Sequence, residues 1–203
     1  ALKIALLSLG VKPGERVLTV ANAGGYASIA IRDIGAVPLY VDIRSSNLGM
    51  DIDGPYGLER VLNAGADKPS AIVVTHLFGN AAPIERIVEI AARHDIPVVE
   101  DCAQSFGAEV RNKKLGTFGL VAACSFYPTK NLGALGDGGA IFTSSAGVAE
   151  RARSLRQYGW SDRYNSEIAG GQNSRLDEIQ AAVLRIRLRK IEHSNLRRRE
   201  IHQ

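Results

Sequence analysis

The sequence predicts a three-layer α/β fold in which a mostly parallel β-sheet is covered by helices on both faces. Two observations lead to this prediction. Short segments rich in β-branched residues alternate along the chain with helical patterns, and these segments are apolar at almost every position instead of every second one. A strand that is apolar throughout is buried on both faces, and helices between such strands provide the crossovers that parallel strands require. With 203 residues, 45% of them hydrophobic, the chain can bury one sizeable core.

The expected strands and helices follow one another in a regular order. Apolar segments bounded by turn residues predict strands at 16–21, 38–42, 71–76, 97–101, 122–127 and 140–143. Helical periodicity predicts helices near 26–34, 58–63, 83–94 and 148–158, and a further helix that ends before Gly10. Beyond residue 173 we expect one long helix, because apolar residues mark one side of it: Leu176, Ile179, Val183, Ile186 and Ile191.

Charge and cysteine content argue against several classes of function and leave one alternative open. The formal charge is +4, and many of the basic residues lie after residue 184. They follow a helical pattern with no interleaved aromatic residues, which favours a solvated helix face over the alternative, a nucleic-acid-binding module. No apolar stretch is long enough to span a bilayer. Cys102 and Cys124 lie in apolar segments without metal-ligand spacing, so we expect core packing, no metal site and a reducing, cytoplasmic setting.

Polar residues close several of the expected strands at their carboxyl ends, where parallel sheets bind their ligands. These residues are Asp42, His76, Asp101 and Tyr127. A carboxylate at the end of a buried strand, such as Asp101, needs a cationic partner. Lys130 follows another strand in a turn of small residues, which suits an imine-forming amine. Pyridoxal 5'-phosphate (PLP) uses both groups, because it forms a Schiff base with a lysine and pairs its pyridine nitrogen with an acid.

Several segments carry a resemblance to a known family. They read Glu-Asp-Cys-Ala-Gln-Ser-Phe-Gly-Ala at 100–108, Ser-Phe-Tyr-Pro-Thr-Lys-Asn-Leu-Gly at 125–133, Gly-Asp-Gly-Gly-Ala at 136–140 and Asn-Ser-Arg-Leu-Asp-Glu-Ile-Gln-Ala-Ala at 173–182. Because these segments occur in the order of the family, the chain resembles the DegT/DnrJ/EryC1/StrS family of PLP-dependent sugar aminotransferases, which have the aspartate aminotransferase fold. The resemblance implies a PLP-binding large domain over 1–173, truncated at both ends, and a helix at 174–203 that leads toward a C-terminal small domain.

The resemblance also implies roles for individual residues. Lys130 would form the Schiff base and move protons, and Asp101 would keep the pyridine nitrogen protonated. Gln104 would reach the phenolic oxygen of the cofactor, and Ser125 would hydrogen-bond its phosphate. Asn173 would reach the phosphate across a dimer interface, although an N-cap of the following helix is an equally physical interpretation.

The chain departs from the family pattern at two places. The main phosphate-binding turn of the family would lie upstream of Ala1. An ungapped match also places glycine where many relatives stack an aromatic side chain on the pyridine ring, which leaves Tyr26 as the candidate for stacking. The Asn-Ala-Gly-Gly-Tyr sequence at 22–26 resembles the branch that acts on 3-keto sugar nucleotides. His76 corresponds to a family histidine near the mouth of the site, or it caps its strand.

The resemblance therefore predicts an aminotransferase that moves an amino group from an amino acid, with L-glutamate as the expected donor, to a nucleotide-linked keto sugar. The predicted cofactor is PLP, and the predicted assembly is a homodimer. Two alternatives stay open within the same fold. One is a related PLP enzyme that acts on a cyclitol or an aminoaromatic precursor, and the other is a non-catalytic regulatory or binding protein.

Overall fold

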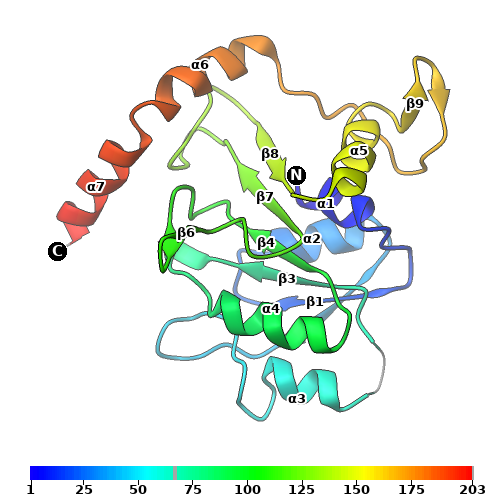
Figure 1. Ribbon diagram of the computed structural model, residues 1–203, viewed down its shortest axis with the longest axis vertical. Coiled ribbons are helices and arrows are strands. Elements are labelled where there is room, and N and C mark those ends of the chain that lie inside the picture. Colours follow the sequence, from blue (N-terminus) through cyan, green and yellow to red (C-terminus); the bar gives the residue numbers. More distant parts are fainter. Residues whose placement is uncertain (66–67, 203) are drawn as a thin grey trace.

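The structure, a computed structural model that describes residues 1–65 and 68–202, is built around one six-stranded sheet (Figure 1). The strands lie in the order β2-β1-β3-β4-β7-β8. Their bounds are β1 Arg16–Val20, β2 Val37–Val41, β3 Ala71–Thr75, β4 Val98–Asp101, β7 Val121–Ser125 and β8 Gly139–Phe142. The pairings between the first five strands of this order are parallel, and β8 runs antiparallel to β7. The predicted mostly parallel sheet is therefore confirmed.

Helices cover both faces of this sheet, as predicted. Helices α1 (Leu2–Ser8) and α2 (Tyr26–Asp33) pack on one face, where they bury Leu6 and Ile31 against Val73 and Val99. Helices α3 (Leu58–Asn63) and α4 (Ile84–Arg93) pack on the other face, against side chains such as Ile72. Neighbouring residues of one strand point to opposite faces, so each strand contributes to both cores. This double burial is the reason why the strand segments are apolar throughout.

The remaining elements lie around the ends of the sheet. A single 3₁₀ turn, η1 (Leu77–Gly79), follows β3. Two short hairpins are formed by β5 (Glu109–Val110) with β6 (Lys113–Lys114) and by β9 (Trp160–Asp162) with β10 (Asn165–Ser166). Helix α5 (Ala146–Leu155) packs on α1 through Ala152, Leu155 and Ile4. None of the helices in the described part of the chain combines the length and the apolar character that a membrane crossing requires.

The prediction of one long helix after residue 173 is wrong. The structure has two helices, α6 (Glu178–Leu188) and α7 (Ile191–His202), separated by a turn at residues 189–190. No glycine or proline marks this turn in the sequence. The break lets both helices contact the body of the protein, because Leu184 on α6 is buried in the core and Asn195 on α7 reaches residues near the sheet.

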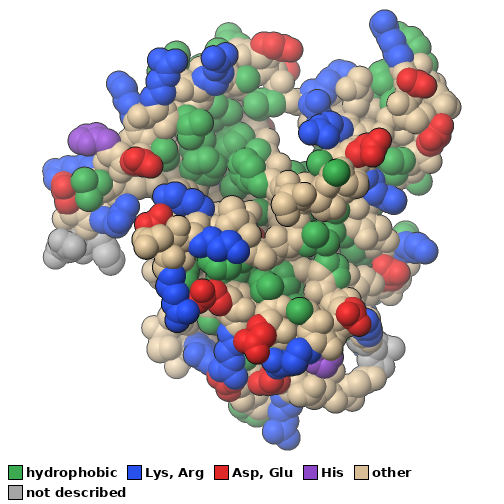
Figure 2. Space-filling view, in the orientation of Figure 1, with side chains coloured by type: hydrophobic (Ala, Val, Ile, Leu, Met, Phe, Trp, Pro, Cys, Tyr) green, Lys and Arg blue, Asp and Glu red, His purple; other side chains and the backbone are tan. Residues whose placement is uncertain are grey.

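The apolar side expected for this helix is only partly covered, because Leu176 and Ile191 pack against the core while two other members stay exposed. Ile179 and Ile186 keep 68% and 63% of their surface accessible to solvent. Figure 2 shows hydrophobic side chains gathered along α6, with Lys and Arg side chains on its outer side. Arg187, one of these basic residues, also binds the body of the protein. It donates hydrogen bonds to the carbonyl oxygens of Gly133 and Ala134 at 2.6 and 3.2 Å.

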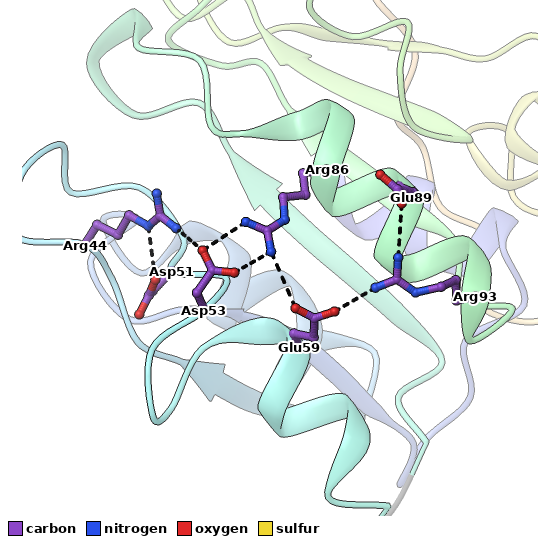
Figure 3. A network of polar contacts seen from close by, with 7 residues as sticks. All are labelled: Arg44, Asp51, Asp53, Glu59, Arg86, Glu89 and Arg93. Carbon is purple, nitrogen blue, oxygen red and sulfur yellow. Dashed lines mark hydrogen bonds and ion pairs between the residues drawn. The ribbon is translucent and has the colours of Figure 1, made fainter.

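A network of ion pairs joins α3, α4 and the segment that precedes α3 (Figure 3). Arg86 on α4 contacts Asp53 and Glu59, and the other members are Arg44, Asp51, Glu89 and Arg93. Each pair is at least partly exposed, so each is worth less than about 1 kcal/mol. Because seven charges are connected, the network aligns the two helices that cover this face of the sheet.

Candidate active site

The candidate site begins with Asp101, the last residue of β4. The strand register places Asp101 beside Thr75 of β3 and Ala123 of β7. Asp101 follows Val99 by two residues, so both side chains point to the face that α1 and α2 cover. Ser125 follows Ala123 by two residues and shares this face. The sheet thus presents a carboxylate and a hydroxyl on the same face at the carboxyl ends of β4 and β7, with Ser125 two residues further along than the register neighbour of Asp101.

The Asp101 carboxylate is buried and has few partners. Only 4% of the residue is exposed. Its oxygens accept hydrogen bonds from the Thr75 hydroxyl at 3.3 Å and from the backbone N–H of Ala103 at 3.1 Å. Burial raises the pKa of Asp101, and the Ala103 N–H, the Thr75 hydroxyl and the positive charge of Lys130 oppose this rise only in part. In the described part of the chain no cation forms an ion pair with Asp101, so this acid would gain from a cationic ligand.

Lys130 sits in the turn at residues 126–134, which follows β7. The turn is closed by a hydrogen bond of 2.7 Å from the N–H of Ala134 to the carbonyl of Phe126. Glycine is required at 133, because a Cβ there would lie 2.5 Å from the Pro128 carbonyl oxygen. Helix α6 holds the outer side of the turn through Arg187, which binds two carbonyl groups at its end. This turn fixes where the lysine side chain starts, and Lys130 is close enough for its charge to act on Asp101.

Gln104 lies in the turn after β4, and one end of its amide is already bound. The Oε1 atom accepts a hydrogen bond of 2.7 Å from the backbone N–H of Phe78. Phe78 presents this N–H from a left-handed conformation, with φ of 56°, which is uncommon for a bulky residue. A backbone N–H can only donate, so the amide oxygen must face Phe78. The Nε2 group, which has no partner among the described residues, is therefore the end that can donate to a ligand.

The other three predicted site residues differ in their surroundings. The Ser125 hydroxyl is half-buried and accepts a bond of 3.3 Å from the N–H of Tyr127. Asn173 is exposed and forms an isolated bridge with Gln157. Tyr26 begins α2, and its ring, with 64% of the residue exposed, lies close to Gly24. Asp101, Lys130, Gln104 and Ser125 thus follow the ends of neighbouring strands, whereas no contact in the described chain joins Asn173 or Tyr26 to them.

The N-cap interpretation of Asn173 is wrong. Helix α6 begins at Glu178, and its N-cap residue is Asp177, whose side chain makes no capping hydrogen bond. Residues 174–177 form an irregular segment, in which the Ser174 hydroxyl accepts a bond of 2.8 Å from the amide of Gln172. Asn173 is therefore an exposed side chain on a connecting segment, free of any role within α6.

Sequence reasoning missed a second buried acid, Glu100. Its side chain points to the face opposite Asp101 and is fully buried. The carboxylate accepts backbone N–H bonds of 2.7 to 2.8 Å from Gly116, Phe118 and Gly119. It also accepts a bond of 3.1 Å from Nε2 of His76. Burial alone would raise the pKa of Glu100, but the bonds from His76, Gly119 and Gly116 outweigh it and hold this pKa below its usual range.

His76 directly follows β3, so it caps the end of its strand, and it is fully buried between two hydrogen bonds. Its Nδ1 atom accepts a bond of 3.1 Å from the N–H of Ala82. The proton of a neutral ring must then be on Nε2, which donates it to Glu100. The contact is thus a hydrogen bond from a neutral imidazole to a carboxylate. The acid doublet at 100–101 could have indicated this arrangement, since strand alternation sends its two members to opposite faces.

One group of possible metal ligands occurs here, because potential ligand atoms of His76, Glu100 and Cys102 lie within 4.8 Å of one another. Both ring nitrogens of His76 and both oxygens of Glu100 already have hydrogen-bond partners. The hydrogen bond with Cys124 and, after it, burial raise the pKa of the Cys102 thiol, which disfavours the thiolate that a metal would need. The donor set is therefore poorly suited to a metal. Cys102 and Cys124 are both buried in the core, as predicted.

Comparison of the chain with known proteins points to one family. The sequence profile of the DegT/DnrJ/EryC1/StrS aminotransferase family matches residues 1–203. One relative, "Erythromycin biosynthesis sensory transduction protein EryC1" of Saccharopolyspora erythraea, is 41% identical over 203 residues, which are 100% of this chain and 54% of that protein. Another, "dTDP-3-amino-3,4,6-trideoxy-alpha-D-glucose transaminase" of Streptomyces venezuelae, is 41% identical over 98% of this chain and 50% of its own length.

A solved structure agrees with the sequence comparison. A DegT DnrJ EryC1 StrS aminotransferase from Brucella abortus superposes with a TM-score of 0.88 at 36% identity. The match covers 95% of this chain and 52% of that one. The chain thus spans about half the length of the relatives that it matches.

Proposed function

The chain belongs to the DegT/DnrJ/EryC1/StrS aminotransferase family, whose members depend on PLP, and we propose that the whole protein is an aminotransferase that makes an amino sugar. The amino group comes from an amino acid, with L-glutamate as the donor, and goes to a keto sugar carried on a nucleotide, at position 3 of the sugar. The observation that carries this proposal is the pair formed by a buried, unpaired acid and a lysine held in a rigid turn, Asp101 and Lys130.

The residues of the site fit PLP. Asp101 is a buried carboxylate without an ion-pair partner among the described residues, and a protonated pyridine nitrogen is a cation that would satisfy it. Gln104 has only its donor end free, which suits an anionic phenolic oxygen. The Ser125 hydroxyl lies on the same face as Asp101, where its O–H could donate to a phosphate. When bound, PLP supplies the electron sink that lets a proton leave the α-carbon of an amino acid.

Each residue of the site then has a definite task. The Lys130 amine would hold the cofactor and would carry a proton to and from the α-carbon of the substrate. Asp101 holds a proton on the pyridine nitrogen, and Thr75 and Ala103 hold Asp101 in place. Gln104 donates its N–H to the phenolic oxygen without adding charge. Asp101 and Lys130 sit on a buried strand end and a closed turn, so little reorganisation is needed during the reaction.

The nature of the substrate rests on the relatives. One of them is named as a transaminase of a dTDP-linked 3-amino sugar, and this supports a nucleotide-linked 3-keto sugar. A keto sugar has no charged group of its own, so recognition would depend on the nucleotide and the hydroxyl groups. A cyclitol or an aminoaromatic precursor is the alternative substrate within the same chemistry.

Assembly and domain organisation are further parts of the proposal. Asn173 is exposed, and no contact among the described residues joins it to the rest of the site, which fits a side chain that serves a neighbouring subunit of a homodimer. Residues 1–173 would form the PLP-binding large domain. Residues 174–203 would lead toward the small domain that a protein twice this length can hold.

A second candidate is a regulatory protein that binds PLP without turnover. The name of one relative, which calls it a sensory transduction protein, favours this candidate. The two functions separate in a glutamate half-reaction with the whole protein, followed by absorbance as the cofactor takes up the amino group. An aminotransferase releases 2-oxoglutarate in an amount equal to the enzyme, and the aminated enzyme then discharges onto a dTDP-linked keto sugar. If PLP binds but neither 2-oxoglutarate from glutamate nor 2-oxoglutaramate from glutamine appears, the regulatory function is supported instead.

A further inference from the structure

We infer that Asn195, on α7, is a positioning residue that locks the turn of Lys130 to the turn of Gln104. This inference rests on the proposed function, because it assigns Asn195 a role at the same site. Asn195 lies in the basic C-terminal segment, 64 residues from Asn131 and 89 residues from Phe106 along the chain. Asn131 directly follows Lys130, and Phe106 lies two residues after Gln104.

Both ends of the Asn195 amide are used, and their orientation is determined. The Nδ2 group donates a bond of 2.9 Å to the carbonyl oxygen of Phe106, which can only accept. The Oδ1 atom must therefore face the other way, where it accepts a bond of 2.9 Å from Nδ2 of Asn131. One amide thus connects the two turns on the site, and neither bond can form if the amide is reversed.

The Gln104 turn leaves space for this amide. A Cβ at position 107 would lie 2.8 Å from Nδ2 of Asn195, and Gly107 has φ of +87°. Both the close approach and the backbone conformation favour glycine there. The glycine at 107 thus has a physical explanation in the contact with α7, which lies far away in the sequence.

The two turns carry groups that must keep a fixed separation. Lys130 anchors the cofactor at one point and Gln104 meets it at another, so a shift between the turns would misplace one contact relative to the other. Helix α6 already holds the far end of the lysine turn, where Gln180 accepts a bond of 2.8 Å from the N–H of Leu135. Asn195 is the link that also reaches the Gln104 turn. A displacement of about 1 Å in such a constellation can lower a rate about a hundredfold.

The experiment uses the whole protein, in which borohydride reduction of the PLP complex first tests for an adduct on Lys130. Asn195→Ala removes both hydrogen bonds, and Asn195→Asp has the same shape but places an acceptor against the Phe106 carbonyl. His193→Ala is the matched control, since His193 is exposed on the same helix. The readouts are the PLP dissociation constant and the pH at which the absorbance of bound PLP changes, which reports the surroundings of Lys130.

We expect both Asn195 variants to bind PLP roughly tenfold more weakly, as the loss of one to two hydrogen bonds implies. We also expect the pH of the absorbance change to shift, while His193→Ala behaves as the parent. Asn131→Ala should have a similar effect, and the double variant Asn131→Ala/Asn195→Ala should be little worse than either single variant.

The inference on Asn195 is overturned if its variants only lower the melting temperature and leave the absorbance profile of bound PLP unchanged. It is equally overturned if the effects of Asn131→Ala and Asn195→Ala add. If Asn195→Ala does not fold, the isosteric Asn195→Asp decides the outcome alone. Absence of a Lys130 adduct in the parent protein overturns the proposed function and this inference together, whereas the first two outcomes leave the proposed function intact.

Discussion

Replacement of Glu100 by glutamine tests how the interior beneath the site is held together. The side chain keeps its size, and one of its oxygens becomes an NH₂ group. In the protein the four donors around the carboxylate are three backbone N–H groups and Nε2–H of His76. In the better of the two orientations, the glutamine oxygen serves Phe118 and Gly119. The new NH₂ group then faces the donors of Gly116 and His76.

The size of the effect follows from this count. Two buried donors lose their acceptor, and each such loss costs about 1 to 3 kcal/mol. His76 cannot offer an acceptor in exchange, because its Nδ1 atom is needed by the N–H of Ala82. The free energy of unfolding of Glu100→Gln should therefore fall by roughly 4 kcal/mol, within the range for breaking a buried charged contact.

Urea unfolding of the whole protein without PLP, followed by circular dichroism, measures this change. The control is Glu89→Gln, because Glu89 is exposed on α4 and, among the described residues, forms an ion pair with Arg93 alone. We expect the control to change the free energy of unfolding by about 0.5 kcal/mol or less. If Glu100→Gln costs no more than the control, the hydrogen-bond arrangement deduced for Glu100 and His76 is wrong.

Three further predictions concern the same region. Asp101→Asn should make the protein without PLP more stable at pH 7. The pKa of Asp101 is raised in the folded protein, so folding disfavours the ionised carboxylate, and this cost grows as pH rises above the pKa of Asp101 in the unfolded chain. Urea unfolding measures the gain in stability, and a loss of stability would contradict the prediction. Because the pKa of Glu100 is lowered in the folded protein, its carboxylate stabilises the fold above the unfolded pKa of about 4.5, and this stabilisation is lost as pH falls through the folded pKa. The parent protein should therefore lose more stability in acid than Glu100→Gln does. Parallel profiles of stability against pH for the two proteins would refute this prediction. Gly133→Ala should distort the turn around Lys130, because the new Cβ would lie 2.5 Å from the Pro128 carbonyl oxygen. This variant should lower the yield of the borohydride adduct several-fold. The control Gly147→Ala should leave the yield unchanged, because nothing lies within 4 Å of a Cβ at that position.

The sheet could be predicted from the sequence because its strands are buried on both faces. Each of β1, β3, β4 and β7 carries apolar residues at successive positions, which leaves few alternatives to a covered parallel sheet. Asp101 and Lys130 could be found for a related reason, since each is a charged residue that ends or follows an apolar run. A charged residue beside an apolar segment can be recognised in the sequence without knowledge of the fold.

The features that were missed depend on contacts between distant parts of the chain. The turn at residues 189–190 has no glycine or proline to mark it, because it follows from where α6 and α7 are anchored. The partners of Asn195 are 64 and 89 residues away, so no local pattern could indicate them. Glu100 was overlooked beside Asp101 because adjacent acids look alike in a sequence, whereas in a strand they face opposite cores.

The most direct test of the account is to reduce the PLP complex of the whole protein with borohydride and to locate the pyridoxyl group by peptide mass spectrometry. The account predicts a single adduct on Lys130, and no adduct in Lys130→Ala. An adduct on another lysine, such as Lys113 or Lys114 in the β5–β6 hairpin, would contradict the assignment of the site. The absence of any adduct would contradict the proposal that this protein works as a PLP enzyme.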